Sequence, residues 1–529
     1  MVSLCGSGLS CSRRAPHAAD LPVIPIPQEV KRTPGCFIVK PTTTIYAPEN
    51  ENAAAWHLQA RFETAAGMHL HWSQERGINT ILFTSDDKRS DLVCEAYLLK
   101  ITPDGVEICA NTPSGHFYGV QTFLQLLPPE VYSPSTVSNV IWQAPCLEIF
   151  DAPKYSWRSF MLDSGRQFQS VDFIKRYLDL LAMLKINVFH WHLTEGQGWR
   201  VMIKRYPRLT QIGSRVAQGE EQQGFYTHDD IREIVAYAAT RFITVVPEID
   251  VPGHCEAALI AYPELSCFAQ SPESVMAYSP NLICAGKEEN YQFLEQVLDE
   301  LCELFPGDYI HLGGDEAPKD YWDKCPACRK KIKEEGLKDS NDLQRYFSKR
   351  LADYLRRKGK KAIFWGDIVY QDGEPLPDNV VVFWWNSRAH GDLAYRNALR
   401  RGHRVICGTN AYCYLNYPVV PWSQYDHSRT FDLKTTYENN PSDLCDPDRL
   451  VLGMACCLWT DWHVRMHMID QRVFPRIYSL ADQMWRQGTR RPFEIFYKII
   501  KSTYPRLKIL GVDYGPAMAK EVPAGYQWE

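Results

Sequence analysis

The residues best suited to chemistry lie in one short segment, His311-Leu312-Gly313-Gly314-Asp315-Glu316. It continues an apolar run that we interpret as a buried strand, and burying two unpaired carboxylates in a core would be costly. Adjacent carboxylates also push their pKa values apart, so that one can act as an acid while the other is ionised. The alternative is a solvated strand end before a helix cap. The two glycines argue against it, because they indicate that another group approaches the backbone closely.

Eight apolar, strand-like runs alternate with amphipathic helical patterns from about residue 153 onward. The runs are Trp157–Asp163, Ile186–Leu193, Ile243–Asp250, Tyr309–Glu316, Ala362–Asp367, Val380–Asn386, Val405–Thr409 and Leu452–Asp461. This alternation predicts an α/β fold, a (β/α)8 TIM barrel that forms the catalytic domain. In such a barrel the active site lies where the strands end.

Most of the runs end in, or just before, polar and aromatic residues. These residues are His190, His192, Glu195, Glu248, Asp250, His254, Asp315, Glu316, Trp365, Trp384, Trp385, Tyr414, Trp459 and Asp461. Singly, a strand tryptophan is more often part of a core, and a histidine on an apolar strand is more often a hydrogen-bonded core residue. Together they predict an acid–base site with aromatic walls at one end of the barrel.

The chain divides into a leader, two domains and a tail. Residues 1–20 lack the apolar stretch of a signal peptide and are expected to be a disordered leader, with a trimmed signal or an expression scar as alternatives. Residues 21–150 are predicted to form a smaller α+β domain, residues 151–490 the barrel, and residues 491–529 a C-terminal helical tail that packs on the barrel. No apolar stretch approaches the length of a membrane span.

The composition of the 529 residues is that of a globular protein with a mild net charge of −5 and no basic block, which argues against nucleic acid as a partner. The 17 cysteines are scattered and do not resemble a disulfide framework. Cys325-Pro326-Ala327-Cys328 is the one CxxC pair, and no second pair or paired histidines follow at ligand spacing. We therefore expect neither a metal nor another cofactor. The high aromatic content suits sugar binding, and equally suits a large core.

Several motifs, in order along the chain, resemble glycoside hydrolase family 20, the β-N-acetylhexosaminidases. The motifs are Ser114–Thr122, Trp157-Arg158 through Arg166, Asn187–Leu193, Pro247–His254 and His311–Glu316. The resemblance implies an exo-enzyme that acts, with retention, on glycans with a terminal β-linked N-acetylhexosamine. GlcNAc is the expected sugar, with GalNAc and 6-O-sulfated GlcNAc as alternatives. We expect a secreted or periplasmic protein, and the oligomeric state is left open.

The resemblance also implies roles for the reacting groups. Glu316 matches the general acid/base that protonates the glycosidic oxygen, and Asp315 matches the carboxylate that holds the 2-acetamido group. The acetamido oxygen itself attacks C1 and forms an oxazolinium intermediate, so that no protein nucleophile is needed. Tyr414 matches the hydroxyl that hydrogen-bonds the acetamido oxygen. We expect the neighbouring anion to raise the pKa of Glu316, because the acid must start protonated.

Three tryptophans match the walls that press the N-acetyl group into place. They are Trp365, Trp385 and Trp459. Trp384 is adjacent to Trp385, and alternation along a strand should turn only one of the two inward.

Other residues match positions that bind the sugar ring or support the acid. Arg158 matches the residue that binds the 3- and 4-hydroxyls, and Glu195 is its expected partner. His254 and Asp250 are expected to form a supporting pair behind the acid.

The chain departs from the family pattern at two places. The family often has two consecutive acids where this chain has Glu195-Gly196, and it usually has a glutamate, which binds the 4- and 6-hydroxyls, where this chain has Asp461. Asp461 reaches less far, and Trp462, His463 and Arg465 follow it. These donors and this positive charge suit a sulfate ester on O6 better than a bare hydroxyl.

Two other functions stay open on the sequence. The first is a carbohydrate-binding protein on an inactive barrel, and the intact Asp315, Glu316 and Tyr414 argue against it. The second is an ordinary two-carboxylate glycosidase that does not need an N-acetyl group. A requirement for the 2-acetamido group would separate that enzyme from the substrate-assisted one.

Overall fold

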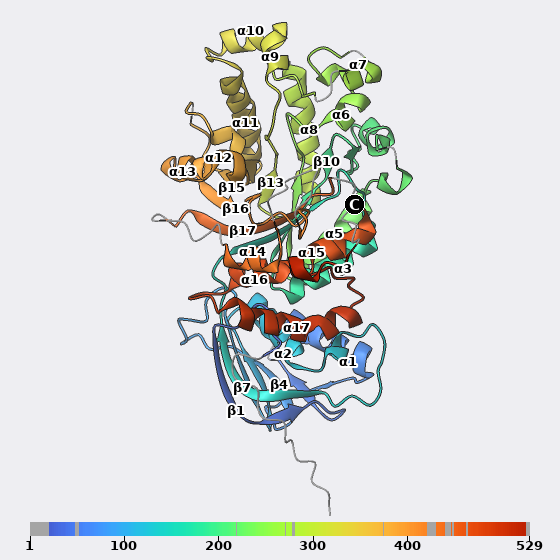
Figure 1. The fold of residues 1–529 in the computed structure, drawn as a ribbon, viewed down its shortest axis with the longest axis vertical. Coiled ribbons are helices and arrows are strands. Elements are labelled where there is room, and N and C mark those ends of the chain that lie inside the picture. The colour runs from blue at the N-terminus through green and yellow to red at the C-terminus, as the bar shows by residue number, and fades with distance from the viewer. Residues whose placement is uncertain are drawn as a thin grey trace, which may run out of the picture.

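The structure is a computed structural model that describes residues 21–47, 52–217, 219–269, 271–277, 281–373, 375–420, 430–439, 446, 449–461 and 464–524. The expected leader, residues 1–20, therefore lies outside the described residues. Figure 1 shows a sheet domain at one end of the molecule and a barrel at the other, with one long helix between them. Among the described residues, no helix is both long and apolar enough to cross a membrane.

The larger domain is a closed barrel of eight parallel strands, which confirms the predicted fold class. Each expected run overlaps one strand, with differences of a few residues at the ends. The strands are β8 (Trp157–Asp163), β9 (Val188–His192), β12 (Thr244–Glu248), β13 (Tyr309–His311), β14 (Lys361–Trp365), β15 (Val380–Trp384), β16 (Arg404–Cys407) and β17 (Val451–Leu458). The barrel closes where β17 pairs with β8, from Gly453 with Trp157 to Leu458 with Leu162. All eight strands consequently end on the same side.

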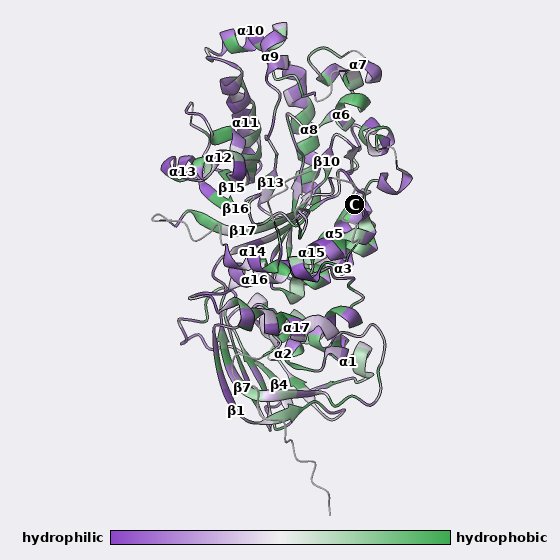
Figure 2. Ribbon diagram, in the orientation of Figure 1, coloured by the Kyte–Doolittle hydropathy of each residue, from purple (hydrophilic) through white to green (hydrophobic). Residues whose placement is uncertain are grey.

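The outer helices follow the amphipathic patterns in the sequence. They include α3 (Val171–Met183), α5 (His228–Ala239), α8 (Glu288–Leu304), α11 (Ser340–Arg357), α13 (Leu393–Arg400) and α16 (Ile477–Trp485). Helix α11 buries Leu343, Phe347, Leu351 and Leu355 on one face, while its other residues are mostly hydrophilic (Figure 2). The expected single helix over 464–485 is interrupted between α15 (Ile469–Val473) and α16, because Pro475 has no N–H to donate.

The smaller domain is a seven-stranded sheet with helices on one face. Its strands are β1 (Glu29–Ile38), β2 (Thr44–Tyr46), β3 (His71–Trp72), β4 (Thr80–Thr84), β5 (Tyr97–Thr102), β6 (Gly105–Cys109) and β7 (Gln143–Asp151), in the order β1-β7-β5-β6-β4-β2-β3. Helices α1 (Ala53–Ala66) and α2 (Pro113–Leu126) pack against each other, and α2 packs on β5 and β6.

The sheet domain covers the end of the barrel where the strands begin. Buried Lys185, just before β9, donates to Asp151 at the end of β7 at 2.7 Å. Helix α17 (Phe493–Ile509) lies between the two domains, and Arg506 on it donates to Gln125 of α2 at 3.0 Å. The helix also contacts α14 (Leu433–Glu438) on the barrel side. The end of the barrel where the strands finish is thus left open to the surroundings.

Candidate active site

A tight turn after β13 places the adjacent carboxylates of Asp315 and Glu316 at the open end of the barrel. Gly313 and Gly314 both have positive φ, +65° and +98°, a region that favours glycine. A Cβ on Gly313 would lie 1.6 Å from Oδ1 of Asp250, and the same oxygen accepts a hydrogen bond from the N–H of Gly314 at 3.1 Å. The close approach that the glycines indicated is therefore that of the Asp250 carboxylate.

Asp315 is buried and incompletely paired. Its Oδ2 lies 3.7 Å from Nε2 of His254, while its Oδ1 has no hydrogen-bond partner among the described residues. Burial raises the pKa of Asp315 to about 7, with further contributions from Asp367 and Glu316, although the charge of His254 opposes the shift. A buried carboxylate oxygen without a donor is costly, and this one is positioned to accept a hydrogen bond from a ligand.

Glu316 is the more exposed of the two acids, with 59% of its side chain accessible. Its Oε2 lies 3.3 Å from Nε2 of His254, and a hydrogen bond from this imidazole lowers the pKa of Glu316. The expectation of a raised pKa for Glu316 is therefore wrong for the protein alone. The desolvation that separates the two pKa values acts on Asp315, because that carboxyl is the buried one.

Three charged side chains connect Glu316 to the wall of the barrel. Nδ1 of His254 lies 2.9 Å from Oε1 of Glu195, which is also bound by Arg166. Arg166 donates to Asp163 at 2.8 Å, and its guanidinium lies 5.2 Å from the ring centre of Trp459. Burial lowers the pKa of His254, but Glu195 and Asp315 outweigh it and hold that pKa well above its ordinary value. Asp250 and His254, the pair expected behind the acid, both lie beside Asp315, with one polar atom of each of the three within 4.8 Å of the others.

The expectation that Arg158 binds the sugar is wrong, because this arginine lies at the opposite end of the barrel. It is the second residue of β8 and donates to Glu95 of the sheet domain at 2.7 and 2.9 Å. About 3.3 Å per residue separates it from the end of the strand, on the order of 15 Å in all. Arg166, just beyond the end of β8, occupies the site instead and is the partner of Glu195.

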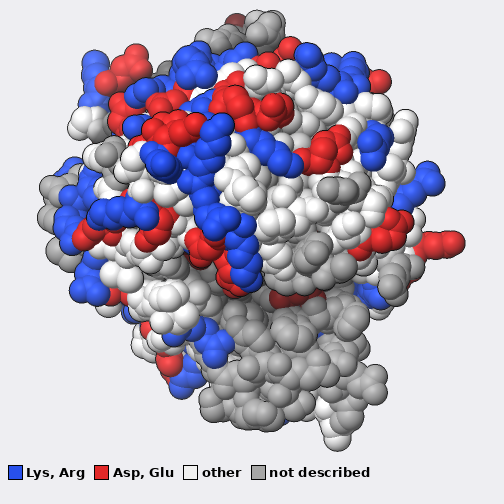
Figure 3. Space-filling view, turned by 90° about the horizontal axis from the view of Figure 1, so that it is seen from above, with Lys and Arg blue, Asp and Glu red and all other residues white. Residues whose placement is uncertain are grey.

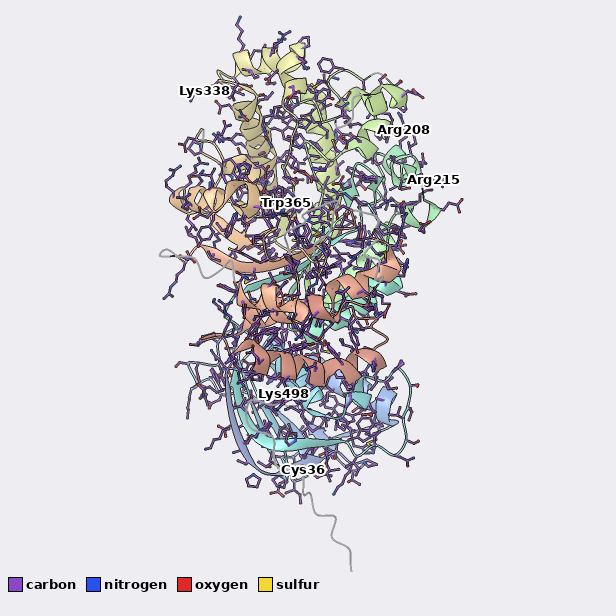
Figure 4. All side chains as sticks on the ribbon, viewed as in Figure 1. Cys36, Arg208, Arg215, Lys338, Trp365 and Lys498 are labelled. Carbon is purple, nitrogen blue, oxygen red and sulfur yellow. The ribbon has the colours of Figure 1, made fainter. Side chains whose placement is uncertain are left out.

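Four aromatic rings form a box beside Asp315. The ring centre of Trp365 lies 6.5 Å from that of Trp385 and 5.8 Å from that of Trp459. Tyr414 closes the box, stacked on Trp385 at 6.4 Å and 6.1 Å from Trp459. Trp365 is labelled in Figure 4, where it lies inside the barrel. Trp384 instead packs outward against Tyr395 of α13 at 5.2 Å, so the alternation expected of the two adjacent tryptophans is confirmed.

Two acids to which the sequence assigned no role hold the tryptophans in place. Glu248 is buried beneath the box and accepts from Nε1 of Trp365 at 2.8 Å. Asp367 accepts from Nε1 of Trp385 at 2.8 Å and from the N–H of Glu316 at 3.3 Å. Both residues lie within or at the end of expected strand runs, and that position was the available signal.

Glu248 is also ringed by histidines. His190, His192 and His311 approach its carboxylate at 2.8, 2.6 and 3.1 Å. Burial raises the pKa of Glu248, but these histidines outweigh it, so that the carboxyl stays well below its ordinary range. The floor of the site is therefore a fixed anion hydrogen-bonded to Nε1 of Trp365 and Nδ1 of His192, with the rings of His190 and His311 beside it.

Asp461 lies at the rim of the site and is bound by Nδ2 of Asn416 at 2.9 Å. Burial raises the pKa of Asp461 to about 6, and nearby Arg166 opposes the shift. Trp462 and His463, the other residues expected near O6, lie outside the described residues. Arg465 is described, and its Nη1 lies 3.5 Å from Glu221. Viewed from this end of the molecule, cationic and anionic residues intermingle (Figure 3).

Comparisons with known proteins place this geometry among characterised relatives. A family model described as the catalytic domain of glycosyl hydrolase family 20 matches residues 155–488, and one described as domain 2 of that family matches residues 20–152. A β-hexosaminidase of Porphyromonas gingivalis is 36% identical over 525 residues, which are 96% of this chain but 66% of that protein. The chain thus spans slightly less than two thirds of that relative's length.

Two solved structures are similar over nearly the whole chain. The β-N-acetylhexosaminidase of Bacteroides fragilis has a TM-score of 0.87 and 46% identity, and the match covers 96% of this chain and 99% of that one. A mutant β-hexosaminidase of Streptomyces plicatus, in complex with its product GlcNAc, has a TM-score of 0.81 and 28% identity. That match covers 96% of this chain and 99% of the other.

Proposed function

The chain belongs to glycosyl hydrolase family 20, and we propose that it is a retaining exo-β-N-acetylhexosaminidase that releases terminal GlcNAc from glycans. The observation that carries the proposal is the unpaired, buried Oδ1 of Asp315 beside the box of Trp365, Trp385, Trp459 and Tyr414. Such a box accommodates a small planar amide, and the carboxylate accepts its N–H. A carbohydrate-binding protein has no need of Glu316, the exposed acid next to Asp315.

The reaction uses the acetamido group as its internal nucleophile. Asp315 accepts the amide N–H and stabilises the positive charge that develops as the carbonyl oxygen attacks C1. The C1–O bond to the leaving group breaks while Glu316 donates its proton to that oxygen. Glu316 then takes a proton from water, which attacks C1 of the oxazolinium ring, so that the sugar leaves with its original configuration and the acid is reprotonated.

The protein alone holds its protons in the opposite order to the one that this reaction requires. Burial favours protonated Asp315, and His254 favours ionised Glu316. A bound substrate supplies an N–H to Asp315, which stabilises its anion, and covers Glu316, which raises the pKa of that carboxyl by desolvation. Substrate binding therefore favours transfer of the proton from Asp315 to Glu316, and the active protonation state forms in the complex.

Specificity at the remote hydroxyls falls to Arg166 and Asp461 in this proposal. Arg166 is placed to bind hydroxyls of the ring, in the role first expected of Arg158. The side chain of Asp461 is one methylene shorter than that of glutamate and is held by Asn416, so that it reaches less far toward an anion on O6. This supports 6-O-sulfated GlcNAc as a preferred sugar, with GalNAc as the alternative.

One set of substrates tests the proposal. We expect turnover of aryl β-GlcNAc and no measurable turnover of aryl β-glucoside, because the glucoside lacks the nucleophile. A thiazoline analogue of GlcNAc, which resembles the cyclised intermediate, should inhibit competitively and far more tightly than GlcNAc. Comparable turnover of the glucoside, or a trapped ester between a sugar and a protein carboxylate, would point to an ordinary two-carboxylate enzyme.

The sulfate preference has its own test. kcat/KM for aryl 6-sulfo-β-GlcNAc should exceed the values for the unsulfated sugar and for β-GalNAc. His463→Ala should erase most of the preference while it leaves unsulfated turnover nearly unchanged. The secreted or periplasmic location stays a prediction, which fractionation of the source cells would test.

A further inference from the structure

Four cysteines from distant parts of the chain meet beside the active-site loops. Cys267 and Cys284 belong to the segment between β12 and α8, and Cys325 and Cys328 belong to the segment between β13 and α11. The sulfur of Cys284 lies 3.7 Å from that of Cys325 and 3.5 Å from that of Cys328, which lies 3.9 Å from the sulfur of Cys267. All four sulfurs lie within 4.8 Å of one another.

These separations match a metal-bound tetrahedron and do not match disulfides. A Zn–S bond of about 2.3 Å gives about 3.8 Å between the sulfurs of a tetrahedral site. A disulfide joins its sulfurs at about 2.05 Å, and all four cysteines are free. Three of the four are buried, and Cys267 is partly exposed, which leaves one edge through which an ion can enter.

The two backbone segments that carry the cysteines pack closely against each other. Gly286 packs directly on the Cys325–Cys328 turn, since a Cβ at this position would lie 2.3 Å from the carbonyl carbon of Ala327. This close packing holds the CxxC turn against the segment that carries Cys284, two residues before Gly286.

We propose that Cys267, Cys284, Cys325 and Cys328 bind one structural Zn²⁺ as thiolates. Binding releases the thiol protons to solvent, and four sulfurs leave no open coordination position for a substrate or water. The sequence argued against a metal because the CxxC pair had no partner pair nearby. The fold supplies the two missing ligands from 41 or more residues away along the chain.

The ion would join the two segments that carry the acid–base residues. The segment after β12 also contains His254, and the N–H of Ile283, next to Cys284, donates to the carbonyl of Pro252 at 2.9 Å. The segment after β13 begins with Asp315 and Glu316. Trp322, in the segment after β13, already connects the two segments, because its Nε1 donates to the carbonyl of Ile283 at 3.0 Å. Zinc at this place therefore fixes His254 relative to the two acids.

Metal analysis of the tag-free full-length protein, purified without chelators, tests the proposal. We expect close to one zinc per chain. Exchange for Co²⁺ should give the intense thiolate-to-cobalt charge-transfer band and the visible d–d bands of a tetrahedral sulfur site. Removing the metal with a chelator should lower Tm by at least about 5 °C, since binding energy at such a site is folding energy.

Cysteine variants locate the site. Cys284→Ser and Cys328→Ser should lose the metal and the cobalt bands, whereas Cys302→Ser, a half-buried cysteine of α8 outside the cluster, should keep both. If the first two variants fail to fold, the zinc content and cobalt spectrum of the wild type still decide the question. Far less than one zinc per chain, octahedral cobalt, or disulfides among these four cysteines in freshly prepared protein would overturn the proposal. None of these readouts depends on the hydrolase activity.

Discussion

Nε2 of His254 lies 3.3 Å from Oε2 of Glu316, while Nδ1 of the same ring lies 2.9 Å from Oε1 of Glu195. With both nitrogens facing carboxylates, the ring is stable as an imidazolium, and its pKa is raised well above the ordinary value. The cation holds the exposed acid in place, and it also keeps that acid ionised before substrate binds. His254 is thus a positioning residue whose charge sets the resting protonation of the site.

Replacing the proposed acid should separate substrates by their leaving groups. Glu316→Gln cannot donate a proton, so kcat should fall by about 10²–10⁴-fold for an alkyl or sugar leaving group. Activated aryl leaving groups, which need little protonation, should lose much less. The measurement is kcat for a series of β-GlcNAc aglycones of decreasing pKa. Equal losses across the series would contradict the role of Glu316.

Removing the charge of His254 should shift the pH profile upward. The reacting form needs ionised Asp315 and protonated Glu316, one proton shared by the two acids, so the lowered pKa of Glu316 sets the acid limb of kcat/KM and the pKa of Asp315, about 7, sets the basic limb. His254 lowers the pKa values of both Asp315 and Glu316, so His254→Gln should move both limbs to higher pH. A matched control is His228→Gln, whose ring lies outside the site and hydrogen-bonds the carbonyl of Met202. Identical profiles for wild type and His254→Gln would exclude this coupling.

The sequence pattern was sufficient to predict the barrel, but it did not lead us to the correct side chain at the end of every strand. Eight apolar runs predicted eight strands because burial on both faces produces continuous apolar segments. Arg158 was misassigned because it lies near the start of β8, whereas Arg166 follows the end of that strand. The rule that the site lies where the strands end would have favoured Arg166.

Contacts between residues far apart in the sequence explain the remaining differences between the predicted and the observed site. The ion pairs from His254 through Glu195 to Arg166 join three loops. The cysteine cluster joins residues 267 and 284 with a CxxC pair on another loop. The spacing of residues within one loop does not predict which residues of other loops they will contact. The pKa order of Asp315 and Glu316 depends on which carboxyl is buried, and adjacency in the sequence does not determine that.

Arg158, near the start of β8, and Arg166, just beyond its end, should have different consequences when replaced. Arg166→Met removes a group from the site, so KM should rise at least about tenfold, the cost of one charged hydrogen bond to substrate. Arg158→Met breaks a buried ion pair with Glu95 and should lower the free energy of unfolding by about 3–5 kcal/mol, with KM unchanged in the folded fraction. Denaturant unfolding and steady-state kinetics on both variants test this. A raised KM in Arg158→Met alone would reverse the assignment.

The buried carboxyl of Asp315 should lower the free energy of unfolding at neutral and alkaline pH. Its pKa is raised from 3.8 to about 7, so the folded state binds a proton more tightly than the unfolded state. The stability linked to that proton is complete below about pH 4 and is lost as the pH rises through 7. At about 1.4 kcal/mol per pKa unit, the ionised, buried carboxyl costs a few kcal/mol above pH 7.

Asp315→Asn removes this cost because the amide stays neutral, and the variant should therefore be inactive but more stable than the wild type. The gain in Tm should increase from pH 5 to about pH 7 and then level off, as followed by thermal denaturation across that range. Glu316→Gln is the matched control of opposite sign. Its carboxyl has a lowered pKa, so replacing it removes a small stabilisation that is present above the ordinary pKa and is lost as the pH falls. A gain in Asp315→Asn that does not change with pH would mean that the amide packs better, and that the buried charge is not what destabilises the site.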